Sequence, residues 1–243
     1  MGAAHNEPLS AGDPVVELSD LALTYPSSAG PVDVLRGISL RIAAGETVSL
    51  VGPSGSGKSS LMMVIAGLER STGGKVTVGG QNFGDLSEDG LARFRRDSVG
   101  IVFQDFHLVP TMTALENVAI PLEFAGRSDA FSRAEECLGL VGLAHRLTHY
   151  PGQLSGGEQQ RTAIARAFAT EPDLLLADEP TGNLDGDTGT QIVELLFNLQ
   201  ERHNTTLMLI THDPKLAARC QRRLALLDGR IASDSATADQ SAG

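Results

Sequence analysis

Cysteine is scarce in this sequence, and the two cysteines present form no motif. Cys137 and Cys220 are the only cysteines among 243 residues, and they have neither CxxC nor metal-ligand spacing. This pattern disfavours a disulfide-rich secreted scaffold and a cysteine metal site. We interpret both residues as ordinary thiols of a protein in a reducing compartment.

Long apolar runs and repeats are also missing. Apolar runs such as residues 174–177 are far shorter than the roughly 20 residues that cross a bilayer. No internal repeat or heptad array is visible, which disfavours solenoids and long coiled coils. Residues 1–14 lack the basic start and apolar stretch of a secretory signal, and residues 232–243 are small and polar. We expect both segments to be flexible tails.

Basic residues are outnumbered by acidic ones. Lys and Arg total 19 against 30 Asp and Glu, which gives a net charge of −11 and a pI of about 4.9. A protein that neutralises a phosphate backbone has the opposite balance. We therefore expect no nucleic-acid partner. With 41% hydrophobic residues, the chain can bury the core of one α/β domain, with or without a helical insert.

Hydrophobic periodicity divides the chain into three kinds of structure. Residues 15–23 and 35–42 alternate apolar and polar side chains, which predicts an N-terminal antiparallel β subdomain. Between residues 113 and 160 the strand signals stop, and residues 129–147 have helical spacing. This predicts a helical subdomain inserted at about 105–165. Short apolar runs predict the buried strands of a central, mostly parallel sheet at 47–51, 99–103, 174–177, 207–211 and 224–227.

Residues 52–59 fit the pattern G-x-x-x-x-G-K-[ST], between a predicted strand and a helix predicted at 59–68. In a P-loop the backbone N–H groups face the phosphates, Lys58 adds a cation near the β and γ groups, and Ser59 offers its hydroxyl to Mg²⁺. A flexible glycine-serine loop is the alternative, and a kinase or a small GTPase would carry the same motif. The loop residues expected to bind the nucleotide are Gly52, Pro53, Ser54, Gly55, Ser56, Gly57, Lys58, Ser59 and Ser60.

Two adjacent carboxylates follow the apolar run at 174–177. Asp178 and Glu179 stand at the end of a predicted strand, where successive side chains diverge. They can therefore do different work. We expect Asp178 to hold Mg²⁺ and Glu179 to polarise the water that attacks the γ-phosphate. An acidic turn without function is the alternative.

A second candidate phosphate cradle lies at residues 154–161, with the sequence LSGGEQQR. A hydroxyl and two glycines precede a helical run, which makes a second anion-binding helix start. A simple helix cap would have the same composition. One nucleotide needs only one cradle per chain, so we expect this one to close over the γ-phosphate held by a second copy. The residues expected to act in trans are Ser155, Gly156, Gly157 and Glu158.

Together these motifs resemble the ABC transporter ATPase family, and the resemblance extends from residue 15 to residue 231. It implies an α/β fold with a P-loop NTPase core, ATP as substrate, Mg²⁺ as cofactor and a homodimer. It further implies that Tyr25 stacks on adenine, that Gln104 of the Q-loop contacts Mg²⁺ or the attacking water, and that His212 reaches the γ-phosphate or Glu179. The resemblance assigns Asn183 and Asp185 of the D-loop to communication between the subunits.

The segments DEPTGNLD at 178–185 and TMTALENV at 111–118 resemble the LolD, MacB and FtsE branch, and residues 211–220 are similar to those of YbbA. The sequence departs from the commonest family pattern at Glu158, where Gln is frequent, and at Asn183, where Ser is frequent. The branch implies an integral membrane permease partner and a peripheral location on the cytoplasmic face of the inner membrane.

Three functions remain open within the family. The branch implies release or extrusion of lipoproteins or hydrophobic compounds, or else force transmitted to periplasmic or division machinery without transport. A non-transport ATPase acting on DNA or ribosomes is disfavoured. The separation of 97 residues between Lys58 and Ser155 leaves no space for a long coiled coil, and the chain has one P-loop and an acidic balance.

Overall fold

The computed structural model describes residues 14–28 and 30–238, which form ten strands, eight α-helices and two short 3-10 helices. Along the chain these elements are β1 Pro14–Tyr25, β2 Val32–Ala43, β3 Thr47–Val51, α1 Lys58–Ile65, β4 Gly73–Val78, β5 Gln81–Asn82, η1 Phe83–Asp85, α2 Glu88–Ser98, β6 Val99–Val102, α3 Ala114–Phe124, α4 Ala130–Leu140, η2 Pro151–Gln153, α5 Gly156–Phe168, β7 Leu174–Asp178, α6 Gly186–His203, β8 Thr206–Ile210, α7 Pro214–Ala217, β9 Arg222–Leu227, β10 Arg230–Asp234 and α8 Ser235–Ala238.

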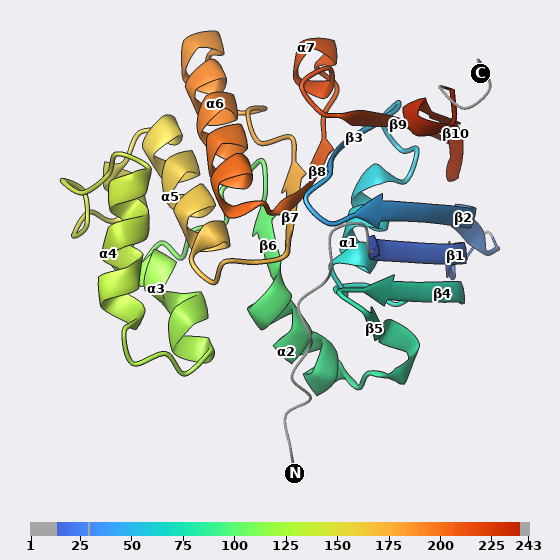
Figure 1. The fold of residues 1–243 in the computed structure, drawn as a ribbon, viewed down its shortest axis with the longest axis horizontal. Coiled ribbons are helices and arrows are strands. Elements are labelled where there is room, and N and C mark those ends of the chain that lie inside the picture. The colour runs from blue at the N-terminus through green and yellow to red at the C-terminus, as the bar shows by residue number, and fades with distance from the viewer. Residues whose placement is uncertain (1–13, 29, 239–243) are drawn as a thin grey trace.

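The strands form two sheets, as the alternation and the apolar runs predict. The first is antiparallel, with the order β2-β1-β4-β5, and the second has the order β10-β9-β3-β8-β7-β6. All pairs in the second sheet are parallel except β10 with β9. The antiparallel sheet lies at one end of the molecule and helices α3 to α5 lie at the other (Figure 1). The predicted α/β class with its β and helical subdomains is confirmed.

The central strands are buried on both faces, which explains why they are apolar throughout. In β7, Leu174 and Leu176 face the core shared with the antiparallel sheet and α1, whereas Leu175 and Ala177 face the core shared with helices α3 to α6. The ends of these strands are consequently packed between the two cores. Side chains that emerge where β3, β7 and β8 end are therefore placed on a rigid edge.

The helical subdomain begins at a capping box and contains no strand. The Thr113 hydroxyl accepts from the N–H of Glu116, whose carboxylate accepts from the N–H of Thr113, so the first turn of α3 is fixed. The helix predicted at 129–147 is shorter in the structure, because α4 ends at Leu140 and Gly142 adopts a left-handed φ of 75°.

Both expected tails, residues 1–14 and 232–243, include residues that belong to strands or helices in the structure. Pro14 already belongs to β1, while residues 1–13 lie outside the described residues. At the other end β10 continues to Asp234 and α8 follows. Arg222 on β9 donates from Nε and Nη2 to both carboxylate oxygens of Asp234, at 2.8 and 2.6 Å, which secures this edge strand. Residues 239–243 again lie outside. No helix in the described ranges is long and apolar enough to cross a bilayer.

Candidate active site

The loop between β3 and α1 has backbone conformations that only glycine tolerates. Gly52 has a φ of 154°, and a Cβ added there would lie 2.2 Å from the carbonyl oxygen of Leu226. Gly57 has a φ of 102° and precedes the first residue of α1. The ammonium of Lys58 folds back over the loop and donates to the carbonyls of Gly52 and Pro53, both at 2.9 Å. The chain thus forms an open cradle at a helix start, with a cation above it.

Ser59 and Asp178 meet beside this cradle, although 119 positions separate them. The Ser59 hydroxyl donates to Oδ2 of Asp178 at 2.9 Å. Burial raises the pKa of Asp178 above its usual range, an effect that the bond from Ser59 opposes and the neighbouring Glu179 increases. A cation placed here would relieve the desolvated carboxylate.

These oxygen ligands fit Mg²⁺. Among the residues that the structure describes, no three His, Cys, Asp or Glu side chains gather into a metal cage. Magnesium bound with a triphosphate does not need such a cage, because phosphates and waters fill the remaining positions around one or two carboxylates. The hydroxyl of Ser59 and the carboxylate of Asp178 are therefore the chain's own candidates for that ion.

Glu179 turns away from Asp178 because its backbone leaves the strand. Its φ is 45°, a left-handed value that is rare outside glycine. Its N–H still donates to the carbonyl of Ile210 on β8 at 3.0 Å. Oε1 of Glu179 lies 2.8 Å from Nδ1 of His212, whose side chain is 79% exposed. The two adjacent acids thus face different partners, as the end of a strand predicts.

Glu179 should control the titration of His212. The hydrogen bond and the charge of Glu179 raise the pKa of His212 above its ordinary 6.5, so the protonated pair persists to higher pH than a free imidazole would and is lost as pH rises through the raised pKa. In Glu179→Gln the NMR titration midpoint of His212 should fall toward the ordinary value. Glu194→Gln, which removes a carboxylate paired with Arg219 instead, should leave it unchanged. A midpoint that does not respond to Glu179→Gln would contradict the pairing.

Gln104 and Asn183 join the Q-loop to the D-loop. Nε2 of Gln104 donates to Oδ1 of Asn183 at 3.1 Å, and Nδ2 of Asn183 donates to the Gln104 carbonyl at 3.1 Å and to Oδ1 of Asp105 at 2.8 Å. A serine at 183 could not make this reciprocal pair, because it has one short hydroxyl. Asp185 accepts from the N–H of Thr188 and caps α6.

Ser155 and Glu158 form a capping box at the start of α5. The Ser155 hydroxyl accepts from the N–H of Glu158 at 3.3 Å, and the Glu158 carboxylate accepts from the N–H of Ser155 at 2.8 Å. Arg146 donates to the other carboxylate oxygen at 2.8 Å. These contacts hold the pKa of Glu158 down to about 2, the bond from Ser155 being the largest cause. The Glu158 side chain is engaged within its own chain.

We call the segment LSGGEQQR at 154–161 the signature, and its two glycines have different surroundings. Gly157 is buried, and a Cβ added there would lie 2.5 Å from Cγ2 of Thr188 in the same chain. Gly156 is half-buried, and its nearest neighbour would be Cδ2 of Leu184 at 3.4 Å, an ordinary contact. Ser155 is exposed. Of the four residues expected to act in trans, Ser155 is thus exposed, Gly156 and Glu158 are half-buried, and Gly157 is buried.

Tyr25, the last residue of β1, is 39% exposed. Its hydroxyl donates to Oε2 of Glu69 at 3.2 Å, and burial together with the Glu69 charge raises the pKa of Tyr25. The bond fixes the hydroxyl end of the side chain at the surface of the β subdomain. Stacking of its ring on adenine stays a prediction.

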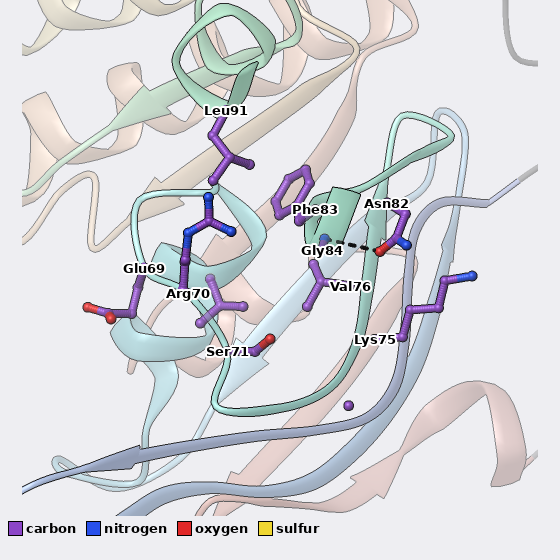
Figure 2. Close-up of a pocket in the computed structure, with 11 residues that line it drawn as sticks. Glu69, Arg70, Ser71, Lys75, Val76, Asn82, Phe83, Gly84 and Leu91 are labelled. Atoms are coloured by element: carbon purple, nitrogen blue, oxygen red, sulfur yellow. Dashed lines mark hydrogen bonds between the residues drawn. The ribbon is translucent and has the colours of Figure 1, made fainter. Parts of the chain in front are cut away.

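A cavity of about 260 Å³ lies outside this site. Val76, Phe83 and Leu91 gather around it, while the side chains of Glu69 and Lys75 extend outward on opposite sides (Figure 2). None of the P-loop residues 52–60 lines it. The phosphate cradle is instead an open loop surface, a form that suits a ligand held by backbone N–H groups.

Sequence patterns did not identify Arg146, Arg166 or Thr188, which contact the motif residues. Arg166 on α5 donates to the carbonyls of Phe106 and His107, just beyond Gln104. No local signal indicates the contacts of Arg146 and Arg166, because these arise when separate segments pack. Thr188 differs, since it bonds to Asp185 only three positions away. The capping role of Glu158 had a signal, since a serine followed three residues later by a glutamate is the pattern of a capping box.

Comparisons with known proteins agree with the geometry. The family model described as ABC transporter matches residues 35–182, which include the P-loop, the signature and the acid pair. A LolD protein of Geobacter metallireducens, named a lipoprotein-releasing system ATP-binding protein, is 52% identical over 90% of this chain and 99% of its own length. YbbA of Escherichia coli K12, named an uncharacterized ABC transporter ATP-binding protein, is 48% identical over 91% of this chain and 98% of its own length.

Two further comparisons extend the same likeness. MacB of Shigella flexneri, named a macrolide export ATP-binding/permease protein, is 44% identical over 90% of this chain but only 34% of its own length. Among solved structures, the ATP-binding cassette MJ0796, described as dimeric and bound to ADP and Pi in a post-hydrolysis state, has a TM-score of 0.84 and 42% identity. That match covers 90% of this chain and 97% of the other. LolD, YbbA and MacB lie in the branch that the sequence resembles.

Proposed function

This chain belongs to the ABC transporter family as an ATP-binding subunit of the LolD and MacB branch, and we propose that it hydrolyses Mg-ATP between two copies of itself to drive a membrane partner. The observation that carries the catalytic part is the divergence at the end of β7. Asp178 contacts Ser59 at the cradle, and Glu179 faces His212. One strand thus delivers a ligand for the metal and a general base.

In the proposed reaction, Glu179 accepts a proton from water as the water oxygen bonds to the γ-phosphorus. The bond from that phosphorus to the bridging oxygen of ADP breaks, and ADP and phosphate result. Lys58 leaves the carbonyls of Gly52 and Pro53 to bind the phosphates. Ser59 and Asp178 would hold Mg²⁺, which supplies charge neutralisation at the phosphate oxygens. His212 orients the carboxylate of Glu179 through the 2.8 Å contact.

Lys58→Ala tests whether this loop binds nucleotide. Loss of charge-assisted bonds to phosphate should weaken ATP affinity by about 10- to 100-fold, measured by titration with a fluorescent ATP analogue. Lys75→Ala, at the cavity of Figure 2, removes a lysine elsewhere and should leave affinity within about twofold of the original. Unchanged affinity and unchanged hydrolysis in Lys58→Ala would show that the loop is not a working P-loop.

The proposed homodimer rests on the second cradle. Ser155 is exposed and Gly156 is half-buried at the start of α5. A chain that binds one nucleotide in its P-loop does not need a second phosphate site for that same nucleotide. The similar cassette MJ0796 is described as dimeric. We propose that the segment Ser155, Gly156, Gly157 and Glu158 lies over the γ-phosphate of the partner copy, with Asn183 and Asp185 at the junction between the copies and Tyr25 against adenine.

The membrane partner is proposed from the relatives. The similar LolD protein is named for a lipoprotein-releasing system and MacB for macrolide export. We propose a permease partner at the cytoplasmic face of the inner membrane, with lipoproteins or hydrophobic compounds as cargo. Co-purification of the tagged chain from solubilised membranes tests this, because a permease should be retained by the original protein and by Glu179→Gln. Recovery with division or periplasmic machinery and no transported cargo would favour the force-transmitting alternative.

A further inference from the structure

Two consecutive residues of the loop after β6 have left-handed backbones. Phe106 has a φ of 58° and His107 a φ of 49°. This region is uncommon for any residue other than glycine and most unfavourable for a bulky one such as Phe106, although His adopts it more often than most. Such conformations persist where the surroundings enforce them, and they cluster at functional sites. These two begin just two positions after Gln104.

One side chain holds both residues in place. Arg166 on α5 donates from Nη2 to the carbonyl of Phe106 at 3.0 Å and from Nη1 to the carbonyl of His107 at 2.7 Å. The two terminal nitrogens of the guanidinium thus donate to two successive carbonyls. The rings of His107 and Phe103 also pack in a T-shaped arrangement, with their centres 4.7 Å apart.

Arg166 has no carboxylate partner among the residues that the structure describes. Its acceptors are the carbonyls of Phe106 and His107, and burial lowers its pKa. If the loop moved away alone, a desolvated charge would lose its acceptors, which is costly. The loop and α5 should therefore move together.

The other end of the same short segment is tied to the D-loop. Asn183 pairs with Gln104 and Asp105, whereas Phe106 and His107 are tied to the helix that starts at the signature. Helix α5 packs tightly on β6, because a Cβ at Gly100 would lie 2.4 Å from the carbonyl of Ala167. The peptide between residues 105 and 106 is consequently the point where the two attachments meet.

We propose that Arg166 is a positioning residue that ties the Q-loop to the signature helix, so that movement of the second phosphate cradle is transmitted to Gln104. Arg166 touches neither nucleotide nor metal in this assignment. It keeps the backbones of Phe106 and His107 in the left-handed conformation, and this conformation fixes the position of the Gln104 side chain. The catalytic consequence rests on the proposed ATPase function, whereas the attachment itself does not.

The first test is made without nucleotide. Arg166→Gln should speed amide hydrogen exchange in a peptide spanning residues 103–112 by about tenfold or more, because two bonds to a charged donor are lost. Arg95→Gln is the matched control, since Arg95 donates to the carbonyl of Gly67 at 2.6 Å, away from this loop. Unchanged exchange at 103–112 in Arg166→Gln, or the same rise in the control, would overturn the proposal.

The second test measures ATP hydrolysis. Arg166→Gln should lower kcat by about tenfold with KM for ATP within about twofold, and Arg166→Lys should lie between, because an ammonium lacks the fork that reaches both carbonyls. Adding His107→Gly to Arg166→Gln should restore part of kcat, since glycine adopts the left-handed conformation without enforcement. A normal kcat in Arg166→Gln, or a loss that His107→Gly does not relieve, would overturn the role in positioning. If the original protein proves inactive while the exchange result holds, the proposed function fails and the attachment stands.

Discussion

Glu179→Gln is expected to stop ATP turnover while leaving ATP binding intact. The substitution keeps the size of the side chain but removes the carboxylate that accepts the proton of water, a contribution of about 10²- to 10⁴-fold in kcat. The P-loop contacts of Lys58 and Ser59 are unaffected, so nucleotide titration should give the affinity of the original protein. Steady-state hydrolysis by the purified variant measures the loss. Glu194→Gln, an exposed acid paired with Arg219, should hydrolyse normally.

The same variant should accumulate as an ATP-bound dimer. An uncleaved γ-phosphate remains between the P-loop of one copy and the signature of the other, so both cradles stay occupied. Size-exclusion chromatography with and without Mg-ATP measures this association. Near-normal hydrolysis by Glu179→Gln would remove Glu179 as the base, and a variant that stays monomeric in saturating ATP would contradict the proposed arrangement.

Gly156→Asp is expected to abolish hydrolysis, by about 100-fold or more, through an effect on the partner copy. A carboxylate at the start of α5 would face the γ-phosphate of the opposite protomer and repel it. Gly156 suits this experiment better than Gly157, because a side chain at 157 would collide with Thr188 of its own chain, whereas one at 156 meets Leu184 at an ordinary 3.4 Å. Gly156→Ala occupies similar space without charge and should lose much less activity. Thermal melting checks that both variants fold.

Local sequence patterns predicted the elements at the edge of the sheet where β3 and β7 end, while the catalytic roles of the residues there stay predictions. Strand β7 is a continuous apolar run followed by two acids. The loop at 52–59 is recognised from the spacing of its glycines, lysine and serine within eight residues. Both features depend on few neighbours, so the sequence exposes them. Strand β4 was missed because it begins with two glycines and is followed by two more, and β5 was missed because it has only two residues. Strand β10 was missed because it is a polar edge strand held by Arg222 and Asp234.

The use of individual side chains was harder to predict. The capping of α5 by Glu158 and its pairing with Arg146 were not predicted, and the contact of Glu158 with a partner's nucleotide stays a prediction. The direction in which Gly157 faces depends on how α5 packs against α6, and no local pattern encodes it. The hydrogen bonds from Arg166 to the carbonyls of Phe106 and His107 likewise join residues about 60 positions apart. Such contacts follow from tertiary packing rather than from spacing along the chain.

The composite site is tested most directly with two kinds of heterodimer, each isolated through different affinity tags on its two chains. In the first, one copy carries Lys58→Ala and the other Gly156→Asp. In the second, one copy carries both substitutions and the other none. If the sites form head to tail between copies, the first heterodimer keeps one intact site and should regain about half of the original hydrolysis rate. The second has one defect in each site and should be inactive. Activity in the second and none in the first would show that each nucleotide is served by the signature of its own chain.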